Sequence, residues 1–438
     1  APHQQIQAVR EQDLSDEHSD VSDFYCRHIL VQVHLLFLTS SPLGTKLNLF
    51  YVMIDLMLSS LLALIYTNDL FTAYVFVEIN TIAGCGLIMI RQKGRSLSAA
   101  IRYMIMSQLG SGLFLIGLNM LYDVTGHLLM SPAKAAVAAI EAAGSYEIPM
   151  LVILAVISVG LAIKSGLYPF HYWIPDTYGY ATPTASAVLS GLVSKGYIFL
   201  LIKIFYRVLG RENVVASRIV NVLFVFGLAG MLMGSLHAIL EKDTRRMIAY
   251  SSVAQIGYIY MGIGLGTEAG MVAAVFHMFT HSATKALLFI SAVGLYEVSG
   301  DKKDYKSLRG AGYRNPLAGI GFSVGALSMV GFPMLAGFIS KLLFATSALQ
   351  SPNKMIVTLI GLAVSTTLNA IYFLRLVITL YSREGDRETR GAKGRSAVRK
   401  SSWKLRLAVV CFIFLNLVLG LKSQPIVQAI ADGLLMFE

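Results

Sequence analysis

Several ionisable side chains lie inside stretches of sequence that are otherwise apolar enough to cross a lipid bilayer. A charged side chain at the bilayer centre costs roughly 2.5–3.5 kcal/mol on insertion scales, so such residues are rare unless they serve a function. Their number along one chain predicts a route for protons or other ions. The residues are Glu78, Lys164, Lys195, His277, His281, Lys285 and Lys341.

The elements that must position these residues are membrane helices. Of the 438 residues, 55% are hydrophobic and 14% charged, and the mean hydropathy is +0.64. A soluble domain of this length would not show these values. We therefore predict an all-α integral membrane protein with about eleven transmembrane helices of about 20 residues each. The apolar stretches are 47–66, 70–90, 100–122, 149–168, 184–207, 218–240, 246–266, 270–297, 316–347, 354–381 and 405–422.

Proline and glycine interrupt two of these stretches close to a lysine. Lys164 lies near the end of the fourth stretch, shortly before Pro169 in its continuation, and Pro333 precedes Lys341 in the ninth. Broken backbone at membrane depth is tolerated only beside protein or a water-filled cavity. Broken helices at corresponding places in two halves are typical of inverted-repeat transporters. We therefore predict two inverted five-helix repeats, each with one broken helix.

The predicted organisation has five parts. The parts are a polar N-terminal tail with a short interfacial segment at 1–46, a first repeat at 47–207, a second, inverted repeat at 218–381, a basic cytoplasmic loop at 382–404, and a C-terminal transmembrane helix with its tail at 405–438. The apolar run at 29–38 has about ten residues, which is too short to span a bilayer.

The formal net charge of +11 comes from basic residues that gather in connectors between apolar stretches. The connectors after the second, eighth and tenth stretches are the most basic, and all are even-numbered. The positive-inside rule places that side in the cytoplasm, with the connector at 207–218 as the exception. We predict contact with lipid and no nucleic-acid partner. Arg245 and Arg246, at the start of a helix on this side, are predicted to anchor lipid headgroups.

Other interpretations of the ionisable residues stay open at this point. His277, His281 and Lys285 share one helix face at i, i+4 and i+8. That spacing also suits a metal or haem ligand pair, although no third ligand is evident, and it suits interhelical hydrogen bonding. Lys195 and Lys341 could extend to the headgroups, and Glu78 could lie at a helix end.

Motifs for catalysis or cofactor binding are missing from the sequence. It contains no GxGxxG, no P-loop and no nucleophile elbow. The three cysteines, Cys26, Cys85 and Cys411, are scattered and form no CxxC pair, which excludes a thiolate cluster motif. We predict that the chain itself performs no catalysis and holds no metal or other cofactor.

Four segments carry a specific resemblance: KSGLYPFHYWIPDTYGYATPTASAVLSGLVSK, DTRRMIAYSSVAQIGY, FHMFTHSATKALLF and GFPMLAGFISK. In this order they resemble the antiporter-like proton-translocating subunits of respiratory complex I, Mrp antiporters and membrane-bound hydrogenases. Lys341 stands where one branch of the family uses glutamate, so the chain is more similar to the complex I N-type and Mrp D-type members. Family members usually have fourteen helices, and the three ahead of the repeats are missing or unrecognisable here.

The resemblance implies roles for the seven residues. Glu78 matches the glutamate of the family's fifth helix, and Lys164 matches the lysine of the broken helix that pairs with it. Lys195 matches the lysine at the middle of the molecule. His277, His281 and Lys285 match the polar face of the eleventh helix, and Lys341 matches the terminal lysine of the twelfth. Together they form a horizontal polar axis.

Elementary chemistry supports these roles. A lysine removed from water holds its proton weakly unless a carboxylate lies nearby. Movement of Glu78 relative to Lys164 would therefore switch that lysine between holding and releasing a proton. We expect Lys195 to relay the proton and Lys341 to release it, while the two histidines bridge through water.

Three functions are consistent with the sequence. The first is proton translocation within a respiratory or hydrogenase-type membrane complex, whose partner subunits carry iron–sulfur clusters, flavin or nickel–iron. The second is that of an Mrp-type Na⁺/H⁺ antiporter component, and the third is that of a non-conducting structural component. Each has other membrane subunits as partners, and the expected location is a prokaryotic cell membrane.

Overall fold

The computed structural model describes residues 26–27, 29–32, 46–144, 147–382 and 403–437. Most of the predicted tail at 1–46 and of the basic loop at 382–404 lies outside these residues. The described residues form helices and no strand. The helices are α3 (Leu47–Tyr66), α4 (Leu70–Met89), α5 (Gly94–Thr125), α6 (Met130–Ala142), α7 (Glu147–Ser165), η3 (Phe170–Tyr172), α8 (Trp173–Tyr180), α9 (Pro183–Val188), η4 (Leu189–Val193), α10 (Ser194–Ile204), η5 (Phe205–Leu209), α11 (Arg211–Ala216), α12 (Ile219–Leu240), α13 (Thr244–Gly264), α14 (Glu268–Glu297), α15 (Ala311–Arg314), α16 (Pro316–Val330), α17 (Ala336–Ala348), α18 (Pro352–Leu380), α19 (Trp403–Leu421) and α20 (Ser423–Leu435).

The all-helical membrane fold is confirmed, but the count of eleven spans is not. Within the described ranges, nine helices are long and apolar enough to cross a membrane. The predicted span at 246–266 is α13, which is long enough but more polar. The predicted span at 316–347 is two short helices, α16 and α17. Nearly every residue of α13 is buried, so its polar side chains face protein and the helix does not need an apolar surface.

Both predicted helix breaks are present. Helix α7 ends at Ser165 and α8 begins at Trp173, while α16 ends at Val330 and α17 begins at Ala336. Gly331 ends α16 with a φ of 95°, a left-handed conformation that glycine adopts without steric cost. The inverted relation between the two halves stays a prediction.

Small residues allow close helix pairing beside the ionisable residues. A Cβ atom on Gly227 of α12 would lie 2.5 Å from the Met261 nitrogen of α13, and one on Gly160 of α7 would lie 2.7 Å from the Gly110 oxygen of α5. Close backbone approach through small residues is typical of helix pairs in membranes. It holds α12 against α13 and α5 against α7.

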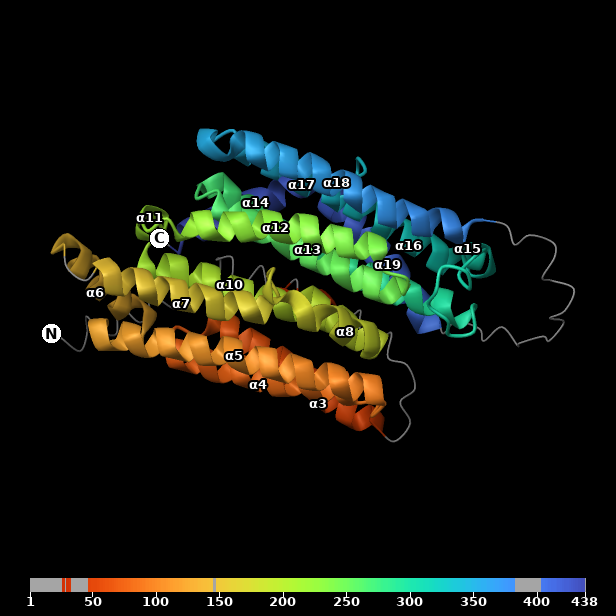
Figure 1. Cartoon of the computed structure of the whole chain (residues 1–438), viewed down its shortest axis with the longest axis horizontal. Helices are drawn as coiled ribbons and strands as arrows, with labels where there is room; N and C mark the ends of the chain where they lie inside the picture. Colours follow the sequence, from red (N-terminus) through yellow and green to blue (C-terminus); the bar gives the residue numbers. More distant parts are fainter. Residues whose placement is uncertain (1–25, 28, 33–45, 145–146, 383–402, 438) are drawn as a thin grey trace, which may run out of the picture.

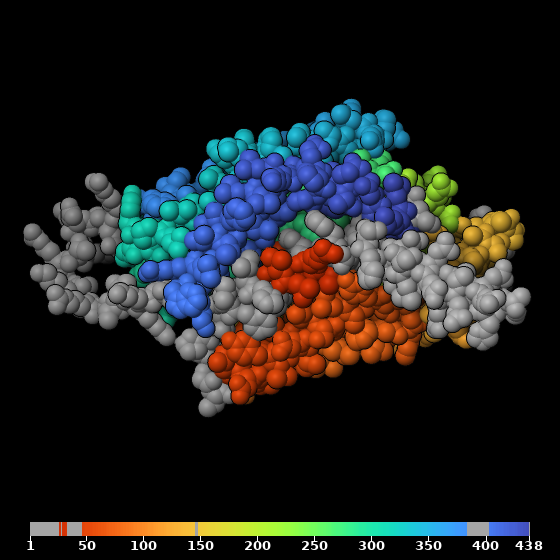
Figure 2. All heavy atoms as spheres, turned by 180° about the vertical axis from the view of Figure 1, so that it is seen from behind, coloured from red at the N-terminus to blue at the C-terminus, as the bar shows by residue number. Residues whose placement is uncertain are grey.

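The helices form one elongated bundle. Figure 1 shows α3, α4 and α5 together at one edge, α7 and α8 next to them, α12 and α13 in the middle, and α18 at the opposite edge. Figure 2, seen from behind, shows the C-terminal helices α19 and α20 in blue across the second half of the chain. Helix α14, which packs against α13, α16, α17 and α19, is therefore enclosed by protein.

Candidate functional site

Glu78 and Lys164 face each other between α4 and α7. The Lys164 Nζ lies 3.9 Å from the Glu78 Oε1, and the Lys164 side chain is fully buried. Gln108 of α5 donates a hydrogen bond of 3.0 Å to the other carboxylate oxygen. The Lys164 ammonium donates to the Thr81 hydroxyl and lies 5.3 Å from the centre of the Tyr197 ring. The predicted pair is thus present, at the outer limit of an ion pair.

The position of Lys164 depends on the α5–α7 contact. A Cβ atom on Gly110 would lie 3.0 Å from the Cγ of Lys164. The lysine is also in the last turn of α7, directly before the break. Gly110 on α5 has no side chain, and α7 ends just after Lys164. Both features leave room for the lysine side chain inside the bundle.

Lys195 follows a short segment of wider helix. Residues Leu189–Val193 form a π-helical turn, η4, ahead of α10. The Lys195 ammonium donates to the Ser190 carbonyl inside this turn, and the side chain is fully buried. π-Helical turns within α-helices are frequent at functional sites, and they leave carbonyl groups without their usual partners. The headgroup alternative for Lys195 is thereby excluded.

His277 and His281 stack on one face of α14. Their ring centres are 5.9 Å apart and the planes differ by 7°. The His277 Nδ1 forms a hydrogen bond with the Ser340 hydroxyl of α17. In the described part of the chain, the His277 Nε2 and both ring nitrogens of His281 are buried without a hydrogen-bond partner. Unpaired buried nitrogens are costly, which indicates a site for water or a mobile proton.

Lys341 lies at the second helix break. Its ammonium donates to the carbonyl oxygens of Met329 and Val330, at 3.0 and 2.6 Å. These carbonyls belong to the last turn of α16, which leaves them free of helical partners. The Lys341 Nζ also lies 5.7 Å from the Tyr258 ring.

A small cavity connects Lys341 with the histidines. Its volume is about 10 Å³, which is close to the space that one water molecule requires. The buried Nε2 of Gln255 also has no partner within the described residues. The lining residues are Gln255, His277, Thr280, His281, Thr284, Ser328, Met329, Gly337 and Lys341.

Lys285 points away from this cavity. Its ammonium donates to the Ile248 carbonyl of α13 at 2.6 Å and to the Ser251 hydroxyl. It is close enough to interact electrostatically with Lys195 and His281. His277, His281 and Lys285 therefore lie on one helix, as predicted. Lys285, however, donates to α13, whereas His277 bonds to α17.

The seven residues form two groups. Glu78 and Lys164 make the first, and the other five make the second, in which Lys195 and Lys341 both interact electrostatically with His277. No hydrogen bond or ion pair of the described chain joins Lys164 directly to Lys195. Helix α10 links the groups, because Tyr197 beside Lys164 is two residues from Lys195.

Sequence reasoning missed several polar partners. Thr81 lies one turn from Glu78 on α4, and Gln108 is a polar residue in the middle of an apolar stretch. Asn416 of α19 accepts hydrogen bonds from Thr284 and Ser328, at 2.7 and 3.2 Å. Gln108 and Asn416 could have been singled out in the sequence, because each is a polar residue inside an apolar stretch. The side chains that they bond to could not have been predicted from the sequence.

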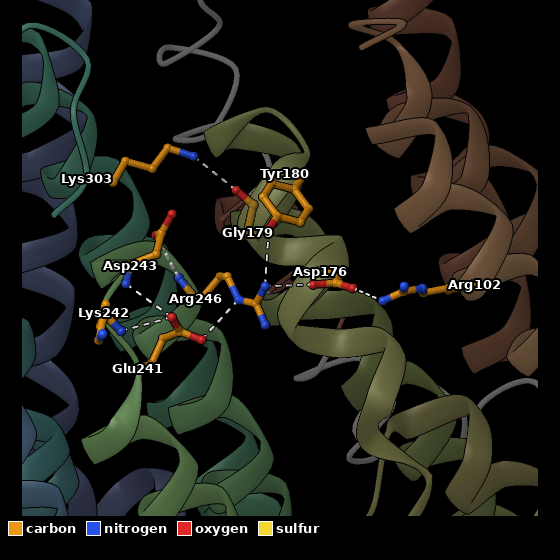
Figure 3. A network of polar contacts seen from close by, with 9 residues as sticks. All are labelled: Arg102, Asp176, Gly179, Tyr180, Glu241, Lys242, Asp243, Arg246 and Lys303. Atoms are coloured by element: carbon orange, nitrogen blue, oxygen red, sulfur yellow. Dashed lines mark hydrogen bonds and ion pairs between the residues drawn. The ribbon is translucent and has the colours of Figure 1, made fainter. Parts of the chain in front are cut away.

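A polar network ties the bundle together at its basic end, which we define as the end with connectors 90–93, 241–243 and 298–310. Asp176 of α8 contacts both Arg102 of α5 and Arg246 of α13, the latter at 3.2 Å. Arg246 also pairs with Glu241 at 3.1 Å, and Figure 3 shows Asp176 between the two arginines. Connectors and helix ends that follow even-numbered predicted spans thus meet at one end.

The network corrects the prediction that Arg245 and Arg246 anchor lipid headgroups. Arg245 is buried and donates to the Ala181 carbonyl at 2.5 Å and to the Ser186 hydroxyl at 2.8 Å. The preference of arginine for fixed oxygen acceptors inside protein explains the difference.

Lys303, in the connector after α14, also joins this end by donating to the Gly179 carbonyl at 3.1 Å. The pKa of Lys303 is lowered to about 8, chiefly by burial and also by the Arg245 charge, while the Asp243 carboxylate acts in the opposite direction.

Metal ligands do not gather in the described part of the chain: no group of three or more histidine, cysteine, aspartate or glutamate residues there could hold a metal ion. The site instead consists of buried amines, imidazoles and hydroxyls. These groups can bind and pass protons, with water filling the gaps.

Comparison with known proteins identifies similar membrane proteins. Residues 67–367 match the family described as NADH:quinone oxidoreductase/Mrp antiporter, TM. NADH-quinone oxidoreductase subunit N of Desulforudis audaxviator is 33% identical over 388 residues, which cover 86% of this chain and 75% of that protein. The D-type component of the Na⁺/H⁺ antiporter of Alkalihalophilus pseudofirmus is 28% identical over 389 residues, covering 88% and 76%. A chain in the structure of the membrane-bound sulfane sulfur reductase, an archaeal respiratory membrane complex, superposes with a TM-score of 0.82 at 26% identity, covering 94% of this chain and 81% of that one.

Proposed function

Because the chain belongs to the NADH:quinone oxidoreductase/Mrp antiporter transmembrane family, we propose that it translocates protons as one subunit of a larger respiratory or hydrogenase-type membrane assembly. Redox cofactors then lie in partner subunits, and the location is a prokaryotic cell membrane. The proposed proton-transfer residues are Glu78, Lys164, Lys195, His277, His281, Lys285 and Lys341.

One observation carries this proposal: three lysines, of which Lys195 and Lys285 are fully buried and Lys341 is partly buried, have no carboxylate partner. Among the described residues, the ion pairs include none with Lys195, Lys285 or Lys341, whose ammonium groups donate to carbonyl and hydroxyl oxygens. A buried charge without an opposite charge costs several kcal/mol. A protein retains such groups at membrane depth when they transfer ions or protons.

The proposed sequence of events begins at the Glu78–Lys164 pair. Approach of the carboxylate favours the protonated amine, and its withdrawal favours release of the proton. The proton then passes from Lys164 to Lys195 through water beside Tyr197 of α10. From there the stacked histidines and one water molecule in the cavity carry it to Lys341, whose amine accepts it. Each step transfers one proton between an amine, an imidazole and water, so no other reactant is required.

A second candidate function is sodium–proton antiport. It is favoured by the similarity to the D-type component of the Na⁺/H⁺ antiporter of Alkalihalophilus pseudofirmus. The two candidates differ in one measurement, since proton flux in vesicles depends on sodium only in the second. A structural role without conduction is the third candidate.

Substitution of Lys164 or Lys341 by Met tests the proposal. Each change removes the titratable amine and preserves much of the side-chain volume. We expect proton flux in vesicles containing the assembled complex to be abolished. Lys422→Met, at an exposed position, is the matched control and should conduct as the wild type does. Undiminished flux in both variants of an intact assembly would exclude these lysines from the mechanism and favour the structural role.

A further inference from the structure

The buried face of α18 is polar, although no proposed proton-transfer residue lies on this helix. Thr358, Ser365, Asn369 and Tyr372 are fully buried, and their spacing of seven, four and three residues places them on one face. The opposite face exposes large apolar side chains, as a surface against lipid requires. The exposed residues include Ile356, Ile360, Ile371 and Ile378.

Tyr372 connects this face to Lys285. The Tyr372 hydroxyl donates to the Asn369 Oδ1 at 2.5 Å and also interacts with the Ser251 hydroxyl of α13. Ser251 in turn accepts a hydrogen bond from the Lys285 ammonium. Lys285, Ser251 and Tyr372 therefore form a row of three groups that carry exchangeable protons. They come from three different helices, and all three side chains are fully buried.

This row leads from the membrane interior towards the basic end. At a rise of 1.5 Å per residue, Lys285 lies about 18 Å from the end of α14 at Glu297. Tyr372 lies about 12 Å from the end of α18 at Leu380, and Ser251 lies about 10 Å from the start of α13. These three helix ends all face the basic end. Ser251 and Tyr372 therefore both lie nearer to the basic end than Lys285 does.

The next group outward is Tyr305, in the connector after α14. Its hydroxyl is buried and has no hydrogen-bond partner among the described residues. The Arg375 guanidinium, one turn beyond Tyr372 on α18, lies 4.5 Å from the centre of the Tyr305 ring. An unpaired buried hydroxyl in this position requires water as a partner.

We propose that Ser251, Tyr372 and Tyr305 form a proton branch that connects Lys285 with the basic end of the bundle. The neutral Lys285 amine accepts a proton from the Ser251 hydroxyl, which is restored by Tyr372. Tyr372 is restored from water beside Tyr305, so each hydroxyl ends in its initial state. This inference rests on the proposed function. It gives Lys285 a role different from that of Lys341 and the histidines, because Lys285 does not line the cavity beside Lys341.

Tyr372→Phe tests the branch, because it removes the hydroxyl and preserves the packed ring. The complete assembly would be placed in phospholipid vesicles, and the rate of proton flux measured in H₂O and in D₂O. We expect flux to be slower by roughly 100-fold or more with a changed solvent isotope effect, as for loss of one positioned proton donor. Tyr206→Phe, at a buried tyrosine outside the branch, is the matched control and should match the wild type. Lys285→Met is measured in parallel.

The outcomes separate this inference from the proposed function. Slow flux in both Lys285→Met and Tyr372→Phe supports the branch. Slow flux in Lys285→Met with wild-type flux in Tyr372→Phe overturns the branch and leaves the proposed function intact. Wild-type flux in both variants overturns the role of Lys285 and the branch with it. If Tyr372→Phe does not assemble, Ser251→Ala replaces it under the same criteria.

Discussion

The Lys164 ammonium lies 3.9 Å from the Glu78 carboxylate but donates its hydrogen bond to Thr81. Gln108 donates a hydrogen bond to the other carboxylate oxygen. Two unit charges 4 Å apart attract by about 1 kcal/mol in water and by about 4 kcal/mol at an effective dielectric constant of 20. Small displacements of this pair inside the bundle therefore change how firmly Lys164 holds its proton.

Glu78→Gln should slow proton flux by about 10- to 100-fold, because a neutral amide cannot alternate between attracting and releasing the Lys164 proton. Flux in vesicles that contain the assembled complex is the measurement. Asp55→Asn, which neutralises an exposed carboxylate on α3, serves as the control. Equal flux in the two variants would contradict the switch.

Thr81→Val should slow flux roughly tenfold, since a hydrogen bond to a charged group contributes about 1.5–3 kcal/mol. Valine has a similar shape but accepts no hydrogen bond, so Lys164 would move towards Glu78 and hold its proton more firmly. Thr81→Ser keeps the hydroxyl and should restore most of the flux. If Thr81→Val and Thr81→Ser behave alike, the hydroxyl has no part in positioning Lys164.

Gly337→Ala should destabilise the second helix break. The added Cβ would lie 1.8 Å from the Ser328 carbonyl oxygen, which is a backbone atom of a packed helix and cannot easily move aside. Overpacking of this kind costs about 1–3 kcal/mol. The thermal stability of the purified assembly would report the loss. Gly112→Ala on α5, where a Cβ meets no atom within 4 Å, should be neutral or slightly stabilising, and an equal loss there would contradict the steric explanation.

Asp176→Asn should lower thermal stability more at low salt than at high salt. The change leaves Arg102 without this carboxylate and leaves Arg246 with Glu241. The screening length falls from about 10 Å at 0.1 M salt to about 3 Å at 1 M, so the partly exposed network weakens with salt. The melting temperatures of wild type and variant should converge as salt is raised. A difference that does not depend on salt, or an equal effect of Asp123→Asn on α5, would argue against the network.

Lys303 should make stability depend on pH in the alkaline range. Its pKa in the folded protein is about 8, below the ordinary 10.5. Between these values the unfolded chain binds more protons, so stability rises with pH from about 8 to about 10.5. Below pH 8 both states are protonated and the cost of burying the charge is present in full. Relative to Lys303→Met, the melting temperature of the wild type should increase across this range, and a constant difference would disprove the contribution.

The sequence alone predicted the membrane class and most of the helices, because hydrophobicity and residue spacing are local properties. It also predicted both breaks, since proline and glycine act on the backbone next to them. The shared face of His277 and His281 followed from their spacing on one helix. The orientation across the membrane, which rests on the basic connectors, stays a prediction.

Only the tertiary structure decided which groups each ionisable residue contacts. Lys285 shares a helix face with the histidines but donates to α13, and Arg245 is buried against Ala181 where a lipid contact was expected. Helix α13 is too polar to qualify as a span by composition, but it is enclosed by other helices. The physical reason is the same in each case: burial and hydrogen bonding depend on which helices pack together, and that is set by shape complementarity between segments far apart in the chain.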